Sequence, residues 1–376
     1  MFHVKRATPA GLGFLDEALA RARERDLLRD RPPPTDGRSL SFCSNDYLGL
    51  AAVPGPLEAS GAGASRLVGG DRPIHAQLEE VAAELVRQPA ALVFTSGYAA
   101  NVGLLSAVAG PGDVVVSDAL NHASIIDGAR LSRARVEVVP HLDVRAVETA
   151  LRTRTEGRAF VITESYFSMD ADSPDLGALR QLCDQHGAAL LVDEAHALGV
   201  LGTDGRGLCA EAGIQADAVI GTFGKAFGAG GAFVAGCPSL VAWLWNRARS
   251  FVFSTGLSPA VAAAALQGLR LAQSEPDRRR RVLVTAALLR DGMVRLGVPP
   301  AGFGHVLPWI LGDAGKALRM AAALRDRGLD VRAIRPPSVP NGTARIRLTV
   351  TAAHGSSDIE RAIADLAAVL APGVAG

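Results

Sequence analysis

Beyond residue 87 the sequence alternates short apolar, β-branched runs with helical patterns, and this alternation constrains the fold more than any other feature. The runs stand at residues 114–116, 136–139, 160–163, 189–192, 219–222 and 231–235. Strands that alternate with helices pair mainly in parallel, with helices covering both faces of the sheet. We therefore predict an α/β protein whose ligands bind at the carboxyl ends of its strands.

The pattern changes after about residue 270. A helix with four consecutive arginines at 278–281 leads to shorter strands at 306–311, 331–334 and 345–350, and a final helix begins near Ser357, where Glu360 is placed to cap it. We predict a smaller α+β domain over 271–376 and a large α/β domain over 41–270. Residues 1–40 are predicted to form a helical segment that packs with the small domain.

Composition excludes several classes of protein. The formal net charge of +1 gives no overall attraction to nucleic acid or to an acidic membrane surface. No apolar run approaches the roughly 18–20 residues that a bilayer requires, and the N-terminus has no secretory pattern. The four cysteines form no CxxC pair and the histidines show no metal-ligand spacing, so we expect reduced thiols, no metal site and a cytoplasmic protein.

Lys225 lies among small and aromatic residues in Gly-Thr-Phe-Gly-Lys-Ala-Phe-Gly, which is not the setting of a surface lysine. A close-fitting, partly dry pocket lowers the pKa of an amine and makes it a nucleophile. Upstream, the apolar run 189–192 ends in Asp193-Glu-Ala-His196. A lysine that forms a Schiff base and a carboxylate for a pyridinium nitrogen are what pyridoxal phosphate (PLP) chemistry needs. Asp-Glu-Ala-His also occurs in a class of helicases, but that interpretation needs an upstream GxxxxGK[ST] loop, which is absent from this sequence.

Three further segments allow a functional and a structural interpretation. Residues Phe94 to Tyr98 are predicted to form the end of a strand, a turn and the start of a helix. The backbone amides of this segment and Ser96 either bind a phosphate or form an ordinary turn in which Ser96 is the N-cap. His122 follows a predicted strand and either stacks on a planar cofactor or makes a local hydrogen bond. Arg345 and Arg347 share one strand face, and Arg347 either binds a carboxylate or lies on a solvated edge strand. The arginines at 278–281 are predicted to form a solvated helix face.

Six short motifs stand in one order along most of the chain, and together they resemble the α-oxoamine synthases, PLP-dependent transferases of fold type I. The motifs are NDYLGL at 45–50, TSGY at 95–98, NHAS at 121–124, FSMD at 167–170, VDEAH at 192–196 and TFGK at 222–225. The resemblance implies a mainly parallel seven-stranded sheet and a homodimer with shared active sites.

The segments 70–75 and 333–349 resemble the branch of that family that condenses L-alanine with a pimeloyl thioester in biotin biosynthesis. Sister branches use glycine or serine with other acyl thioesters, and some relatives are non-catalytic partner subunits that usually lack the lysine. The acyl group could arrive on coenzyme A or on an acyl carrier protein. Arginines at 21, 23, 25, 29 and 31 would suit an acidic carrier, but they equally suit a solvated helix.

The resemblance also implies roles for individual residues. Lys225 would bind PLP as a Schiff base, Asp193 would pair with the pyridinium nitrogen, and His196 would pair with the phenolic oxygen. The other implied cofactor contacts are His122 stacked on the ring, Ser168 beside the ring oxygen, Ser96, Gly97, Tyr98 and Thr222 on the phosphate side, and Thr255 from the partner subunit. The implied substrate contacts are Arg347, Asn45 and His122 for the amino acid, and Arg29 and Ser338 for the acyl group. Three departures stand out: Ser338 replaces a usual Thr, the segment 50–61 is shorter than is usual, and Tyr166 is less usual at its position.

Overall fold

A computed structural model describes residues 14–29, 39–56 and 58–371 of this chain. Its large sheet has seven strands in the order β2-β8-β7-β6-β5-β3-β4, and β8 alone runs antiparallel to its neighbours. The predicted mainly parallel seven-stranded sheet is therefore confirmed. The strands are β2 (Ala90–Phe94), β3 (Asp113–Asp118), β4 (Arg135–Val139), β5 (Arg158–Glu164), β6 (Ala189–Asp193), β7 (Ala218–Thr222) and β8 (Ala232–Gly236).

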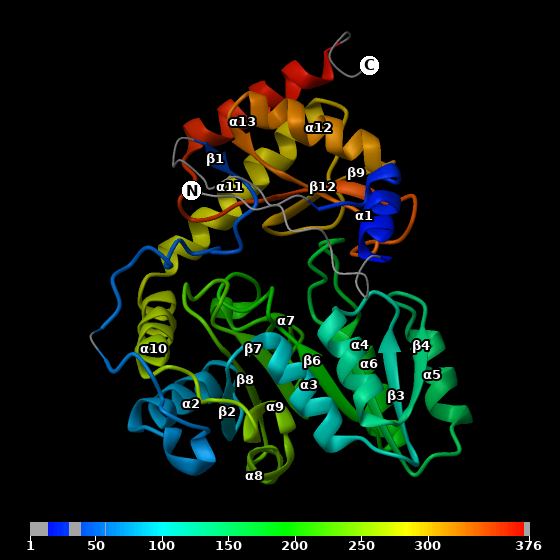
Figure 1. Ribbon diagram of the computed structural model, residues 1–376, viewed down its shortest axis with the longest axis vertical. Coiled ribbons are helices and arrows are strands. Elements are labelled where there is room, and N and C mark those ends of the chain that lie inside the picture. The colour runs from blue at the N-terminus through cyan, green and yellow to red at the C-terminus, as the bar shows by residue number, and fades with distance from the viewer. Residues whose placement is uncertain (1–13, 30–38, 57, 372–376) are drawn as a thin grey trace.

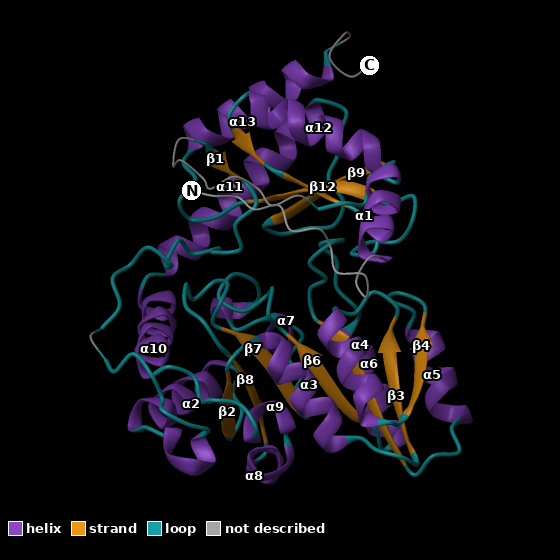
Figure 2. Cartoon of the chain, viewed as in Figure 1, coloured by secondary structure: helices purple, strands orange, loops and turns teal. Residues whose placement is uncertain are grey.

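Helices cover both faces of this sheet (Figures 1 and 2). Successive strand residues alternate between two apolar cores: Leu190 and Val192 enter one core, and Leu191 enters the other. This double burial explains why the strands read as continuous apolar runs. The covering helices are α2 (Pro73–Leu85), α3 (Gly97–Val108), α4 (Ala123–Ser132), α5 (Val144–Thr153), α6 (Leu176–His186), α7 (Leu208–Glu211), α8 (Pro238–Arg247), α9 (Arg249–Val252) and α10 (Pro259–Ser274).

The C-terminal part has its own antiparallel sheet, ordered β11-β12-β9, and its own core around Phe42, Trp309 and Leu348. A parallel pair, β1 with β10, joins an N-terminal segment to it. The division at residues 40 and 270 stays a prediction, and the described part of 1–40 covers only 14–29 and 39–40. The elements are α1 (Phe14–Glu24), β1 (Leu40–Ser41), α11 (Pro276–Arg295), β9 (Val306–Gly312), α12 (Ala314–Asp326), β10 (Leu329–Asp330), β11 (Arg332–Ile334), β12 (Ala344–Thr349) and α13 (Ser356–Leu370).

The structure corrects the sequence-based interpretation of β12. This strand is the central one of its sheet, and Arg345 and Arg347 are both buried. Arg345 donates to the Met169 carbonyl (2.7 Å) and to Asp170 (2.6 Å), which belong to the large domain. The arginines therefore lie where the two domains meet, and the solvated edge strand is wrong.

One prediction about a helix is confirmed in part and another is wrong. In the run 278–281, Arg280 and Arg281 are exposed as predicted, but Arg278 is partly buried and donates to the Leu48 carbonyl (3.2 Å), and Arg281 donates to the Ala352 carbonyl (3.3 Å). At the start of α13 the capping carboxylate is Asp358, which accepts from the Gly355 N–H (2.9 Å), and not Glu360. The helix begins at Ser356, which places Asp358 at its third position.

Candidate active site

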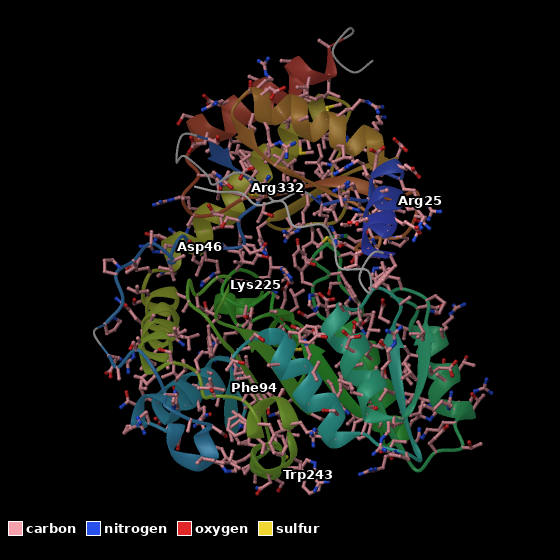
Figure 3. The ribbon with its side chains drawn as sticks, in the orientation of Figure 1. Arg25, Asp46, Phe94, Lys225, Trp243 and Arg332 are labelled. Carbon is pink, nitrogen blue, oxygen red and sulfur yellow. The ribbon has the colours of Figure 1, made fainter. Side chains whose placement is uncertain are left out.

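Four neighbouring strands bring three predicted catalytic residues, and one glutamate that was not predicted, to one edge of the large sheet. Glu164 ends β5, Asp193 ends β6, Lys225 follows β7 by three residues, and His122 follows β3. These strands run parallel, so their carboxyl ends meet at the edge that faces the small domain, where Figure 3 shows Lys225. This is the usual ligand site of an open α/β sheet.

Lys225 lies in a tight turn between β7 and β8. Its carbonyl accepts from the Gly228 N–H (3.1 Å), and Phe223 and Phe227 on either side are fully buried. Burial lowers the pKa of the half-buried Lys225 ammonium to about 8, against the opposing charges of Asp193 and Glu164. About a tenth of the amine is therefore neutral at pH 7, far more than for an ordinary lysine, and nucleophilic chemistry requires this neutral form.

Asp193 is buried, and both of its carboxylate oxygens have donors. Oδ1 accepts from the Ala195 N–H (2.9 Å), and Oδ2 accepts from Nδ2 of Asn101 on α3 (2.7 Å). A buried carboxylate is costly unless such donors satisfy it, so its position is fixed on both sides.

His122 is the N-cap of α4, and its backbone N–H donates to Oε1 of Glu164 (2.8 Å). Burial, reinforced by the charge of Asp193, raises the pKa of the Glu164 carboxyl to about 8, and the charge of Lys225 opposes this. Burial lowers the pKa of His122, although the charge of Asp193 opposes this. The four groups Lys225, Asp193, Glu164 and His122 therefore form one electrostatic unit.

His196 and Arg347 meet through Tyr47. The Tyr47 hydroxyl lies 2.6 Å from His196 Nδ1 and 3.5 Å from Arg347 Nη2. Arg347 also donates to Asn45 Oδ1 (3.0 Å) and, through Nε, to the Ser168 carbonyl (2.7 Å). Burial first, and then the charges of Lys225 and Arg347, lower the pKa of His196 well below 6.5. The structure therefore brings Asn45, Ser168, His196 and Arg347 together.

The segment predicted to bind phosphate opens α3. Ser96 is its N-cap and accepts from the Ala99 N–H (3.1 Å), as the structural interpretation predicted. Gly97 lies against Thr222, since a Cβ built on it would stand 3.9 Å from the Thr222 Cβ. The Tyr98 hydroxyl donates to Asp127 (2.6 Å). The remaining amides at this helix N-terminus have the polarity that an anion needs.

Arg29 and Ser338 come from opposite ends of the sequence and meet, with Arg29 Nη2 donating to Ser338 Oγ (2.9 Å). Ser338 lines a cavity of about 400 Å³, together with His122, Glu164 and Ser168. Thr255 is exposed, away from these contacts, in the one chain that the structure contains.

These residues fit PLP. The chain presents a half-buried amine with a lowered pKa, a strand-end carboxylate with fixed oxygens, and a helix N-terminus, which match an aldehyde, a pyridinium nitrogen and a phosphate. Among the described residues, no group of three or more His, Cys, Asp or Glu side chains could hold a metal ion. In the same part of the chain, every helix is too short or too polar to span a membrane.

Sequence reasoning missed several residues of the site. Asn101, Glu164 and Tyr47 each contact a predicted residue. Two signals were available: Glu164 ends an apolar run, and Tyr47 lies inside a recognised motif. Asn101 sits within a helix, and nothing local distinguishes it.

Comparison with known proteins identifies the family. The sequence matches the model for aminotransferase class I and II over residues 38–366. The 8-amino-7-oxononanoate synthase of Anaeromyxobacter dehalogenans strain 2CP-1 is 48% identical over 89% of this chain and 87% of its own. The structure is similar to Sphingomonas wittichii serine palmitoyltransferase, with a TM-score of 0.89, 27% identity, and coverage of 99% of this chain and 100% of that one.

A second solved structure, of serine palmitoyltransferase (SPT) with PLP, is 28% identical to this chain and has a TM-score of 0.88. The match covers 98% of this chain and 100% of that one. These relatives agree with the family match and imply PLP as the cofactor. The chain therefore belongs to the aminotransferase class I and II family of fold type I and, within it, to the α-oxoamine synthases.

Proposed function

We propose that this protein is an 8-amino-7-oxononanoate synthase, which condenses L-alanine with a pimeloyl thioester and carries PLP on Lys225. The observation that carries the proposal is the amine of Lys225, whose pKa is lowered to about 8, beside the anchored carboxylate of Asp193. The 48% identity to a synthase of that name supports the choice of reaction.

PLP, when bound, supplies an electrophilic aldehyde and a ring that withdraws electrons from the bonds of an attached amino acid. Lys225 would hold its aldehyde carbon, and Asp193 would accept a hydrogen bond from its ring nitrogen. His122 would stack on the ring, while His196 and Ser168 would border its phenolic oxygen. Ser96, Gly97, Tyr98 and Thr222 would surround the phosphate at the N-terminus of α3.

Arg347 and Asn45 would bind the carboxylate of L-alanine. The Arg347 guanidinium is already held by the Ser168 carbonyl and Asn45, so it is oriented before the substrate arrives. Its fork matches a carboxylate with two parallel hydrogen bonds. The cavity beside His122, with its rim at Arg29 and Ser338, would take the acyl chain.

The reaction requires proton transfer at the alanine Cα, which we assign to Lys225. Lys225 Nζ removes the Cα proton, a bond forms between Cα and the acyl carbon, and the carbon–sulfur bond breaks as the thiolate leaves. The bond from Cα to the carboxylate then breaks to release carbon dioxide, and Lys225 returns a proton to Cα. The thiolate takes one proton from solvent.

We further propose a cytoplasmic homodimer in which Thr255 reaches the partner's site. The exposure of Thr255 and the four free cysteines support these two points. The acyl donor would be pimeloyl-coenzyme A or a pimeloyl acyl carrier protein, and the arginines of the segment 21–29 would favour the acidic carrier.

Substrate choice tests the proposal against its alternative. Purified protein loaded with PLP is mixed with pimeloyl-coenzyme A and L-alanine, glycine or L-serine, and thiol release and product mass are recorded. Product with alanine alone supports the synthase. The similarity to serine palmitoyltransferase favours serine as the second candidate, and product with serine or glycine would move the protein to that sister activity. No thiol release with any of the three amino acids, from pimeloyl-coenzyme A or from a pimeloyl acyl carrier protein, would leave a non-catalytic subunit.

Attachment of the cofactor has an independent test, because the sequence has only three lysines, at positions 5, 225 and 316. Borohydride reduction of the loaded protein followed by peptide mass analysis should find the pyridoxyl group on Lys225. The same label on Lys316 alone would contradict the assigned site.

A further inference from the structure

A chain of side-chain hydrogen bonds runs from Asp193 to His122 through two residues that the reaction scheme does not use. Asn101 Nδ2 donates to Asp193 Oδ2 (2.7 Å) and to Ser124 Oγ (3.0 Å). Ser124 Oγ lies 2.7 Å from His122 Nδ1. Asn101 and Ser124 are fully buried, so the bonds between Asp193, Asn101 and Ser124 are shielded from competing water, whereas His122 is exposed at the end of the chain.

The direction of every bond in this chain is determined by groups that can only donate or only accept. The Asp193 carboxylate accepts, so Asn101 presents its amide nitrogen and not its oxygen. In this orientation Asn101 Oδ1 is buried without a hydrogen-bond partner among the described residues, so the bond to the Asp193 carboxylate alone determines which way the amide points. The same nitrogen donates to Ser124 Oγ, which leaves the hydroxyl proton free to point at His122 Nδ1.

The N-cap of α4 shows independently that His122 Nδ1 accepts hydrogen bonds. The backbone N–H of Ser124 donates to His122 Nδ1 (3.2 Å), and a backbone N–H cannot accept. Nδ1 therefore carries a lone pair and no proton. In neutral imidazole the proton must then be on Nε2.

We propose that Asn101 and Ser124 are positioning residues that hold His122 as the neutral Nε2–H tautomer and connect it to Asp193. His122 lines the cavity, so its Nε2–H is the group left to donate to a bound ligand. Nδ1 is occupied and cannot take a proton from the substrate. The part of this inference that concerns turnover rests on the proposed function, in which Lys225 transfers the proton at Cα.

The tautomer is measured directly by NMR on protein labelled with ¹⁵N-histidine, with and without PLP. The His122 signals are assigned by their loss in His122→Asn. Near pH 7 we expect an unprotonated Nδ1 and a protonated Nε2. A protonated Nδ1 in both forms would overturn the proposal, whatever the substrate of the enzyme is.

Variants test the relay itself. Ser124→Ala should shift the Nδ1 resonance and make His122 protonate at higher pH, because the hydroxyl donor to its lone pair is gone, and Ser124→Thr should restore both. The matched control is Ser132→Ala on the same helix, whose buried hydroxyl bonds only its own helix and the following turn. Equal spectra for Ser124→Ala and Ser132→Ala would contradict the relay.

Asn101→Ala should raise the dissociation constant of PLP about 10-fold or more, since a hydrogen bond to a charged group contributes about 1.5–3 kcal/mol. Ser106→Ala on α3, whose hydroxyl bonds the Val102 carbonyl, should leave it unchanged. A protein that makes product from glycine yet keeps the Nε2–H tautomer refutes only the proposed function. One that makes 8-amino-7-oxononanoate with Nδ1 protonated refutes only this inference.

Discussion

On the large-domain side of the site, the side chains of Asp193, Asn101, Ser124 and His122 are joined by hydrogen bonds, and these residues lie on strand β6, helix α3 and the start of helix α4. On the small-domain side, Arg345 and Arg347 instead reach across to a loop of the other domain. The first half is fixed by one folded unit, whereas the second exists only while two units are docked. We therefore expect changes in the first half, the chemical half, to affect chemistry. We expect changes in the second half, the binding half, to affect substrate binding.

Lys225 belongs to the chemical half, and removal of its amine should give the largest effect of all. Lys225→Ala should lower kcat at least about 10³-fold, because a nucleophile and a proton carrier are lost together. Steady-state thiol release measures this, with circular dichroism to verify folding. Lys316→Ala, at an exposed lysine of α12, is the matched control and should have normal kcat. Near-normal turnover by Lys225→Ala would refute the scheme.

The binding half is tested by the two arginines of β12. Arg347→Lys should raise KM for L-alanine about 30–100-fold with a smaller change in kcat, because lysine keeps the charge but cannot form two parallel hydrogen bonds. Arg345→Met should instead lower the free energy of unfolding by about 2–3 kcal/mol, because it breaks the ion pair between the buried Arg345 and Asp170. The loss is no larger because Asp170 is partly exposed and water can solvate its carboxylate once the arginine is gone. If Arg345→Met raised KM as much as Arg347→Lys, the docked interface would matter more than the Arg347 fork.

The pKa of Lys225 predicts a pH dependence for the chemical half. Burial lowers this pKa from 10.5 to about 8, so the neutral amine becomes the major form above pH 8. The rate at which cofactor-free protein captures PLP should rise about tenfold from pH 7 to pH 9, with a midpoint near 8. Stopped-flow absorbance measures it. The charge of Asp193 opposes the lowering of the Lys225 pKa, so Asp193→Asn should move the midpoint to lower pH. A midpoint that did not move would show that the charge of Asp193 does not affect the pKa of Lys225.

The smallest effect is expected at the rim of the binding half. Arg29→Ala should raise KM for the pimeloyl thioester about 2–5-fold and leave KM for alanine unchanged, because exposed polar pairs contribute at most about 1 kcal/mol. Arg25→Ala, another exposed arginine after α1, serves as the control with pimeloyl-coenzyme A. A larger effect at Arg25 than at Arg29 would place the acyl donor elsewhere.

The two halves also differed in how far the sequence predicted them. Asp193 and His122 could be located because each follows an apolar run that marks a strand, and parallel strand ends converge. The environment of Arg345 could not, because its partner Asp170 lies 175 positions away in another domain. Asn101 was missed for the same reason, since Asp193 is 92 positions away. Local patterns predict which groups share an edge, but not which distant donors satisfy them.

The pairing of β1 with β10 has a consequence for biosynthesis. Residues 40–41 find their strand partner only at 329–330, and the Phe42 carbonyl is bonded by the Thr349 N–H (2.8 Å). Domains generally fold as units while the ribosome extends the chain, N-terminal parts first. The large sheet, with Lys225 and Asp193, is therefore complete in the nascent chain while Asn45 still waits for β12. Under the proposed assignment, the groups that bind the cofactor are in place once β8 (Ala232–Gly236) has emerged, whereas the amino-acid site is completed only after residue 349 has emerged.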